Sequence, residues 1–133
     1  MKFLIVDSYS ELNTFKKIVD EFDTFKIIIT STNFQLDIKE KLTNQIINFD
    51  DHISIEESLF YEKKINNIIW NYFFESNYDF TNLNKLSFGS TFAYSSSLLL
   101  KFYYRLKEGF GRIIKNNDTV YILENTNSVV KNA

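Results

Sequence analysis

Apolar positions in this chain alternate between short continuous runs and helically spaced stripes, a pattern that predicts strands alternating with helices. Residues 3–6 form a continuous apolar run, typical of a strand buried on both faces, and the run ends at Asp7. Apolar residues then follow at helical spacing, and residues 25–29 form a second β-branched run. Residues 3–29 therefore predict one strand–helix–strand unit with parallel strands and a right-handed crossover.

The same pattern continues to the end of the chain. In order, it predicts a short helix at 33–44, a strand at 45–49, a long helix at 54–76, a brief extended segment at 86–88, a long helix from 90 or 91 to about 115, a buried strand at 119–123 and the start of a helix at 128–133. We expect a three-layer, Rossmann-like α/β domain with a mainly parallel sheet and two long inserted helices. Because the last helix is cut short, residues 1–133 are expected to be a single domain from the N-terminal part of a longer protein.

Two helix starts carry a capping signature. The S-x-x-E spacing at Ser8–Glu11 and again at Ser54–Glu57 predicts capping boxes, in which each side chain satisfies a free backbone N–H of the first turn. Within the predicted helices, Trp70 and the Phe and Tyr stripes have helical spacing, which favours a place in the core over a stacking platform. The Ser95–Ser97 run lies in a helix and indicates surface or close packing more than a nucleophile.

Composition narrows the functional classes. There is no cysteine, which excludes disulfides, thiolate metal sites and cysteine nucleophiles, and a single histidine leaves no His-rich metal site. The formal charge is −2, so nothing indicates binding of nucleic acid. No signal peptide or membrane-spanning run is evident. The expected location is the cytoplasm or the inner face of the membrane, with peripheral membrane association left open.

Polar residues follow several predicted strands. Asp7 with Ser8, Thr30 with Ser31, and Glu124 with Asn125 would share one edge of a parallel sheet and could line a cleft, where ligands usually bind. Helix N-caps also require Ser, Thr, Asp and Asn at such places, so each residue alone is more readily explained as a cap. A fourth strand end carries Asp50, Asp51 and His52, a pattern more typical of a solvated loop than of a metal site.

The glycine motifs of nucleotide-binding folds are absent. Neither G-x-G-x-x-G after the first strand nor G-x-x-x-x-G-K-[ST] occurs, so NAD and P-loop binding lack their signature, and no cofactor or metal is expected. The G-x-S-x-G elbow of hydrolases is absent as well.

Two families show a resemblance. The opening KFLIVDSYSEL is similar to a response-regulator receiver domain, with Asp50 or Asp51 near the position of its phosphorylated aspartate. Position 8 is Ser where a receiver has a second acid, the last strand leads to Glu124 where a lysine is expected, and no strand separates the two long helices. The alternative function is therefore a degenerate receiver-like or protein-interaction domain without catalysis.

The second resemblance covers most of the chain. The pattern from the third strand onward resembles the N-terminal half of bacterial surface-polysaccharide glycosyltransferases of the GT-B type, through Asp50–Asp51, Glu56–Glu57, Trp70, the LSFGST element at 86–91 and residues 120–125. It implies that a missing C-terminal domain binds the nucleotide sugar while this half shapes the glycan-acceptor side of the cleft. The catalytic base is not identified, and the residues expected to face the acceptor are Asp7, Ser8, Thr30, Ser31, Glu124 and Asn125.

Overall fold

The computed structural model describes residues 1–30, 42–73, 82–83, 86–124, 126 and 128–133. Within it the chain forms two compact units. Unit 1 comprises residues 1–52 and 106–133, and unit 2 comprises residues 53–105. Most of the helix predicted at 33–44 lies outside the described residues.

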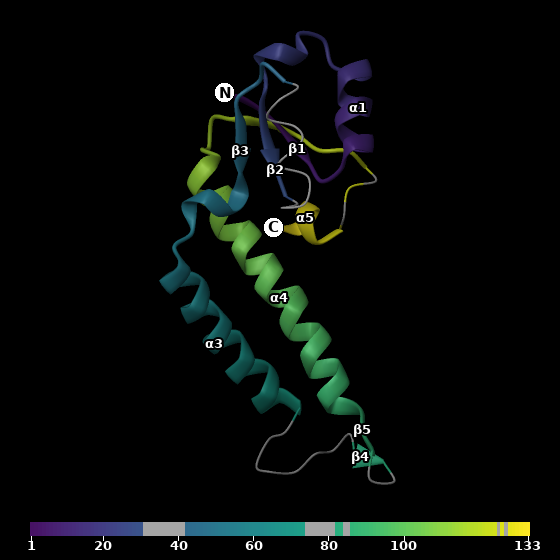
Figure 1. Ribbon diagram of the computed structural model, residues 1–133, viewed down its shortest axis with the longest axis vertical. Coiled ribbons are helices and arrows are strands. Elements are labelled where there is room, and N and C mark those ends of the chain that lie inside the picture. The colour runs from purple at the N-terminus through teal and green to yellow at the C-terminus, as the bar shows by residue number, and fades with distance from the viewer. Residues whose placement is uncertain (31–41, 74–81, 84–85, 125, 127) are drawn as a thin grey trace. The chain divides into compact units, whose positions relative to one another are not determined.

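Unit 1 is built on a four-stranded parallel sheet (Figure 1) with the order β3–β2–β1–β6. Its strands are β1 (Lys2–Val6), β2 (Lys26–Ile29), β3 (Ile46–Asn48) and β6 (Thr119–Tyr121). Phe3 pairs with Lys26 and Val6 with Ile29, so the predicted parallel strand–helix–strand unit is confirmed. The fold is α/β and Rossmann-like, as the sequence predicts.

Helix α1 (Tyr9–Ile18) covers one face of this sheet. Its buried Leu12 and Phe15 join a core cluster with alternate residues of the first two strands, Leu4, Val6, Phe25, Ile27 and Ile29. The intervening residues Phe3, Ile5 and Ile28 point to the opposite face and are buried too. Both faces are therefore covered, which explains the continuous apolar runs.

The remaining buried apolar residues of unit 1 come from its later segments. They are Phe49 of η3 (Phe49–His52), Leu106 and Phe110 near the end of α4 (Phe88–Ile113), and Val130 of α5 (Ser128–Asn132). A short turn of helix, η1 (Phe22–Thr24), connects α1 to β2.

The prediction of a buried last strand was wrong. Val120 is 37% exposed and Tyr121 40% exposed, and β6 ends two residues earlier than predicted. The physical reason is its place at the sheet edge, where it pairs only with β1. An apolar run in the sequence does not distinguish an edge strand from a central one.

The strand order also differs from that of a receiver domain. Receivers have the order 2-1-3-4-5, which places the third strand beside the first. Here β3 pairs with β2, and Asp50 and Asp51 follow this outer strand in η3.

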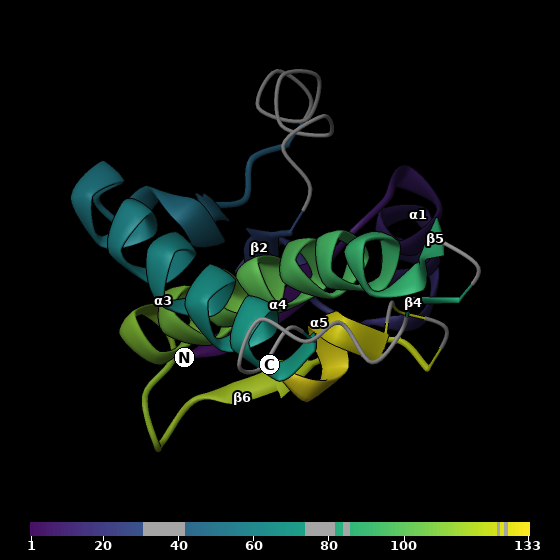
Figure 2. The same ribbon diagram turned by 90° about the horizontal axis from the view of Figure 1, so that it is seen from below.

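Unit 2 is a helical hairpin. Helix α3 (Ile55–Phe73) and the part of α4 up to Arg105 lie side by side (Figure 2). Between them in the chain come two short antiparallel strands, β4 (Asn82–Leu83) and β5 (Leu86–Ser87). Helix α4 begins at Phe88, two or three residues before the predicted start at 90 or 91. The capping box at the start of α3 is confirmed, because Ser54 Oγ accepts from Glu57 N at 3.1 Å and Glu57 Oε2 accepts from Ser54 N at 2.9 Å.

The core of this hairpin is small. Ile65, Ile69 and Ala93 are its buried apolar cluster, with Tyr61 and Leu100 packed against it. Buried Ser97 donates a hydrogen bond to Asn66 Oδ1 at 2.7 Å, which confirms close packing for this serine, whereas Ser95 is exposed.

The prediction that Trp70 belongs to the core was wrong. Trp70 is 46% exposed and Tyr72 71% exposed, because both lie away from the single seam that α3 makes with α4. Helical spacing identifies a stripe but does not show that another element covers it. Among the described residues, no helix is long and apolar enough to cross a membrane.

Candidate functional site

The sheet of unit 1 has a topological switch point between β1 and β6. The chain moves outward from β1 to β2 and β3, and then returns to place β6 on the other side of β1. In open α/β sheets the crevice beyond the carboxyl ends of two such strands is the usual ligand position. The residues that follow β1 and β6 are therefore the ones to inspect.

A hollow of about 250 Å³ lies at this switch point. It is lined by Ser10, Glu11 and Thr14 from the first turns of α1, and by Leu123 and Glu124 from the segment after β6. We call it the switch-point hollow. Pockets for drug-sized ligands usually measure about 300–1,000 Å³, so this one suits a smaller ligand.

Three of the predicted strand-end residues share the edge of the sheet that holds this hollow. Thr30 donates from its hydroxyl to Asp7 Oδ1 at 2.7 Å, since Val6 and Ile29 are paired and the next residues lie side by side. Leu4 of β1 pairs with Tyr121 of β6. Asp7 lies three residues after Leu4 and Glu124 three residues after Tyr121, so both acids follow the same end of their strands. The predicted residues Ser31 and Asn125 lie outside the described part of the chain.

Ser8 is the N-cap of α1. Its side chain accepts a hydrogen bond from Glu11 N at 3.3 Å, so the capping explanation is correct for this residue. In this structure Ser8 is engaged in holding the helix start and is not among the residues that line the hollow.

Glu11 hydrogen-bonds to two separate segments of the site. Its Oε2 accepts from Asp7 N at 2.6 Å and its Oε1 accepts from the Thr126 hydroxyl at 2.8 Å. The carboxylate thus joins the end of β1 to the loop after β6. Thr126 is buried, with 4% of its surface exposed.

This arrangement changes the electrostatics of the helix start. The N-terminus of a helix attracts anions through its free N–H groups and its dipole, and Rossmann folds use that position for phosphate. Here Glu11 places a carboxylate of the chain itself in the first turn of α1. A second carboxylate, Glu124, lies across the hollow, so a phosphate group would meet two negative charges.

The two glutamates differ in how they are held. Both carboxylate oxygens of Glu11 accept hydrogen bonds, whereas Glu124 is exposed, and within the described residues its carboxylate has no hydrogen-bond partner. Thr14 donates its hydroxyl hydrogen to Ser10 O at 2.9 Å, which leaves its oxygen able to accept. The hollow therefore offers mainly acceptor oxygens to a ligand that carries hydroxyl donors.

The sequence prediction missed Glu11, Ser10, Thr14 and Thr126 as site residues. Glu11 was interpreted only as a capping residue, although a cap that follows the first strand necessarily lies at the same sheet edge. No sequence signal identifies Thr126, because its role depends on a contact with a residue 115 positions away.

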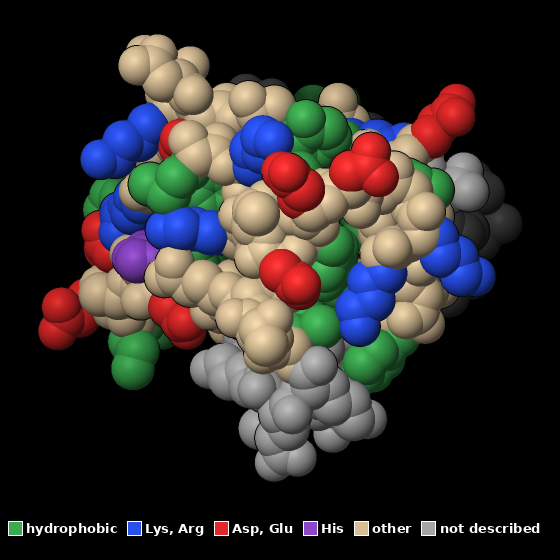
Figure 3. All heavy atoms as spheres, turned by 90° about the horizontal axis from the view of Figure 1, so that it is seen from above, with side chains coloured by type: hydrophobic (Ala, Val, Ile, Leu, Met, Phe, Trp, Pro, Cys, Tyr) green, Lys and Arg blue, Asp and Glu red, His purple; other side chains and the backbone are tan. Residues whose placement is uncertain are grey.

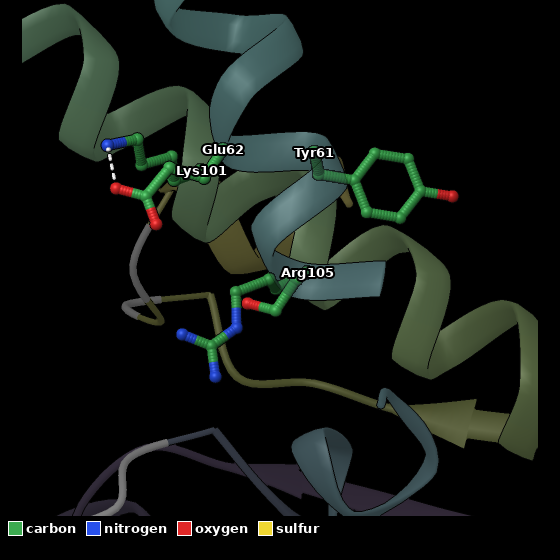
Figure 4. Close-up of a pocket in the computed structure, with 5 residues that line it drawn as sticks. Tyr61, Glu62, Lys101 and Arg105 are labelled. Atoms are coloured by element: carbon green, nitrogen blue, oxygen red, sulfur yellow. Dashed lines mark hydrogen bonds and ion pairs between the residues drawn. The ribbon is translucent and has the colours of Figure 1, made fainter. Parts of the chain in front are cut away.

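A second, smaller pocket of about 60 Å³ lies in unit 2 (Figure 4). It is lined by Ser58, Tyr61 and Glu62 of α3 and by Lys101 and Arg105 of α4. Lys101 Nζ lies 2.9 Å from Glu62 Oε1, and the Tyr61 ring points away from this ion pair. Because Lys101 already has an acidic partner, the pocket is a weaker candidate than the switch-point hollow.

The face of the molecule shown in Figure 3 carries acidic and basic side chains interspersed, without a field of one sign. Among the described residues, no group of three or more His, Cys, Asp or Glu side chains could hold a metal ion. Comparison of the chain with protein-family models, with curated proteins and with solved structures found no match.

Proposed function

We propose that unit 1 binds a carbohydrate acceptor in the switch-point hollow, as the acceptor-side domain of a glycosyltransferase-like protein of cell-surface polysaccharide biosynthesis. The observation that carries the proposal is the pairing of Glu11 and Glu124 with the Ser10 and Thr14 hydroxyls around one small hollow. Sugars present many hydroxyl donors, and carboxylates are strong acceptors for them.

The same geometry bears on where the donor substrate would bind. The carboxylates of Glu11 and Glu124 disfavour a nucleotide diphosphate here, so the nucleotide sugar would be held by another domain of a longer protein. In the transfer, a base would take the proton from the acceptor hydroxyl as that oxygen attacks the donor sugar. Glu124 is our candidate for this base, because the Glu11 carboxylate is already committed to Asp7 N and Thr126.

The test is an NMR titration of the ¹⁵N-labelled chain with neutral oligosaccharides and, separately, with nucleoside diphosphates. We expect oligosaccharides to shift the amide signals of residues 8–14 and 122–126, and nucleoside diphosphates to leave these signals unchanged. Shifts caused by the diphosphate at those residues, with none from any sugar, would contradict the proposal.

A further inference from the structure

Among the described residues of unit 2, more large apolar side chains are exposed than are buried. Its two helices meet through one seam, and the apolar residues buried there are Ile65, Ile69 and Ala93. Large apolar side chains on the other sides of the two helices are exposed to solvent. A helix with exposed large apolar side chains beyond its one contact seam has an apolar face that another protein surface could cover.

One face of the hairpin can be defined from the contacts between its helices. The Glu62–Lys101 ion pair and the Ser97–Asn66 hydrogen bond both lie on it. Five large apolar residues lie on the same side of their helices as these two contacts, at helical spacing from the residues that make them. They are Ile55, Leu59 and Trp70 on α3 and Tyr94 and Leu98 on α4. We call this the Leu98 face. Its exposed fractions run from 46% at Trp70 to 80% at Ile55.

The exposed area of this face is of the size that a stable dimer needs. Since a large apolar or aromatic side chain offers about 150–250 Å², these five half-exposed residues together present about 600 Å². A symmetric contact buries the same patch on both partners, so about 1,200 Å² would be removed from water, the lower end of the range for specific interfaces.

The charges of the face are paired within each copy. Glu62 is 49% exposed and Lys101 23% exposed, and they lie side by side among the apolar residues. Because the two charges are already paired within one copy, a two-fold contact that covers them buries no unpaired charge.

The lack of net charge on the hairpin disfavours two other classes of partner. Residues 53–105 contain five acidic and five basic residues, so the hairpin has no formal net charge. An anionic membrane surface or a nucleic acid attracts a basic patch, and this neutral segment offers neither partner a net electrostatic attraction. Association with a second copy of the chain does not depend on a net charge.

We infer that the Leu98 face is a homodimer interface, on which the hairpins of two copies pack into a four-helix arrangement. The arrangement would complete the small core of each hairpin with apolar residues of the other. This interface is independent of the switch-point hollow.

The test is analytical ultracentrifugation of the full chain across a micromolar to submillimolar range, with Trp70 fluorescence as a second readout. Trp70 is the only tryptophan, so its emission should move to shorter wavelength as the concentration rises and the dimer forms. Leu98→Glu should raise the dimer dissociation constant at least about tenfold and abolish the fluorescence change.

Leu99→Glu is the matched control. Leu99 is 57% exposed and Leu98 50% exposed, but the two neighbours project from different sides of α4. Both variants should keep the wild-type circular dichroism, and Leu99→Glu should dimerise as the wild type does. A wild-type chain that is monomeric at all concentrations would overturn the inference. So would a Leu99→Glu variant that dissociates as readily as Leu98→Glu, or a monomer that co-sediments with phosphatidylcholine vesicles.

Discussion

Thr126 donates a hydrogen bond from its hydroxyl to Glu11 Oε1 across 2.8 Å, and so joins two residues 115 positions apart. The contact holds the loop after β6 against the first turn of α1. These are the two segments whose side chains line the switch-point hollow, so the bond fixes one wall of the hollow relative to the other.

Replacing Thr126 by Val should remove this bond while keeping the shape of the side chain. A net loss of about 1 kcal/mol in unfolding free energy is expected, because Glu11 is half-buried and water can replace part of the lost interaction. Urea denaturation measures the loss. Thr126→Ser retains the hydroxyl and should lose less stability than Thr126→Val. A loss of stability in Thr126→Ser with none in Thr126→Val would show that the methyl group matters and the hydrogen bond does not.

Gly109 should tolerate no side chain. A Cβ built on it would lie 2.3 Å from Phe49 O, and a backbone oxygen cannot move aside as a flexible side chain can. We expect Gly109→Ala to lower the unfolding free energy by about 2 kcal/mol or more.

Gly111 in the same helix provides the control for Gly109. A Cβ at Gly111 meets nothing within 4 Å, so Gly111→Ala should stabilise the chain by up to about 1 kcal/mol through helix propensity. Thermal unfolding of the two variants compares them directly. Similar midpoints for both would mean that α4 does not pack against Phe49 as described.

The sequence was a good guide wherever a local pattern determines structure. The apolar run at 3–6 and its partner at 25–29 specified parallel neighbours, and the S-x-x-E spacing specified both helix starts. These features depend on residues a few positions apart. Polar ends of parallel strands also had to meet at one edge, which is why Asp7 and Thr30 are hydrogen-bonded.

The sequence was a poor guide wherever an outcome depends on what lies next to an element. Trp70 has the spacing of a core residue, yet its side of α3 is exposed. The exposure of β6 follows from its edge position, which only the strand order reveals. Thr126 belongs to the site through its tertiary contact with Glu11, which no local sequence pattern predicts.

Asp118 should give the chain an acid-sensitive contribution to stability. Its Oδ1 lies 2.8 Å from the Met1 ammonium, and this hydrogen bond, reinforced by one from Lys115 N, lowers the pKa of Asp118. A carboxyl whose pKa is lower in the folded than in the unfolded state stabilises the fold above its unfolded pKa. That contribution is lost as the pH falls through the lowered folded value.

Asp118→Asn should therefore be less stable than the wild type at neutral pH, and the difference should shrink as the pH falls below about 4. Denaturation at a series of pH values, on protein with the Met1 amino group free, measures this. Acetylating that amino group should reduce the difference between wild type and variant. A gap that is constant down to the most acidic pH would show that Asp118 is not held by a charge interaction.

We expect Glu124 to offer its carboxylate to the hydroxyl groups of a bound carbohydrate. Glu124→Gln keeps the size of the side chain and removes its charge, whereas Glu21→Gln makes the same change at another exposed position that does not line the hollow. Hydrogen bonds to charged groups contribute about 1.5–3 kcal/mol, so Glu124→Gln should weaken binding at least about tenfold.

The most direct measurement is calorimetric titration of wild type, Glu124→Gln and Glu21→Gln with the oligosaccharide that gives the largest NMR shifts. We expect Glu21→Gln to bind as the wild type does and Glu124→Gln to show the large loss in affinity. Equal affinities for all three proteins would contradict it.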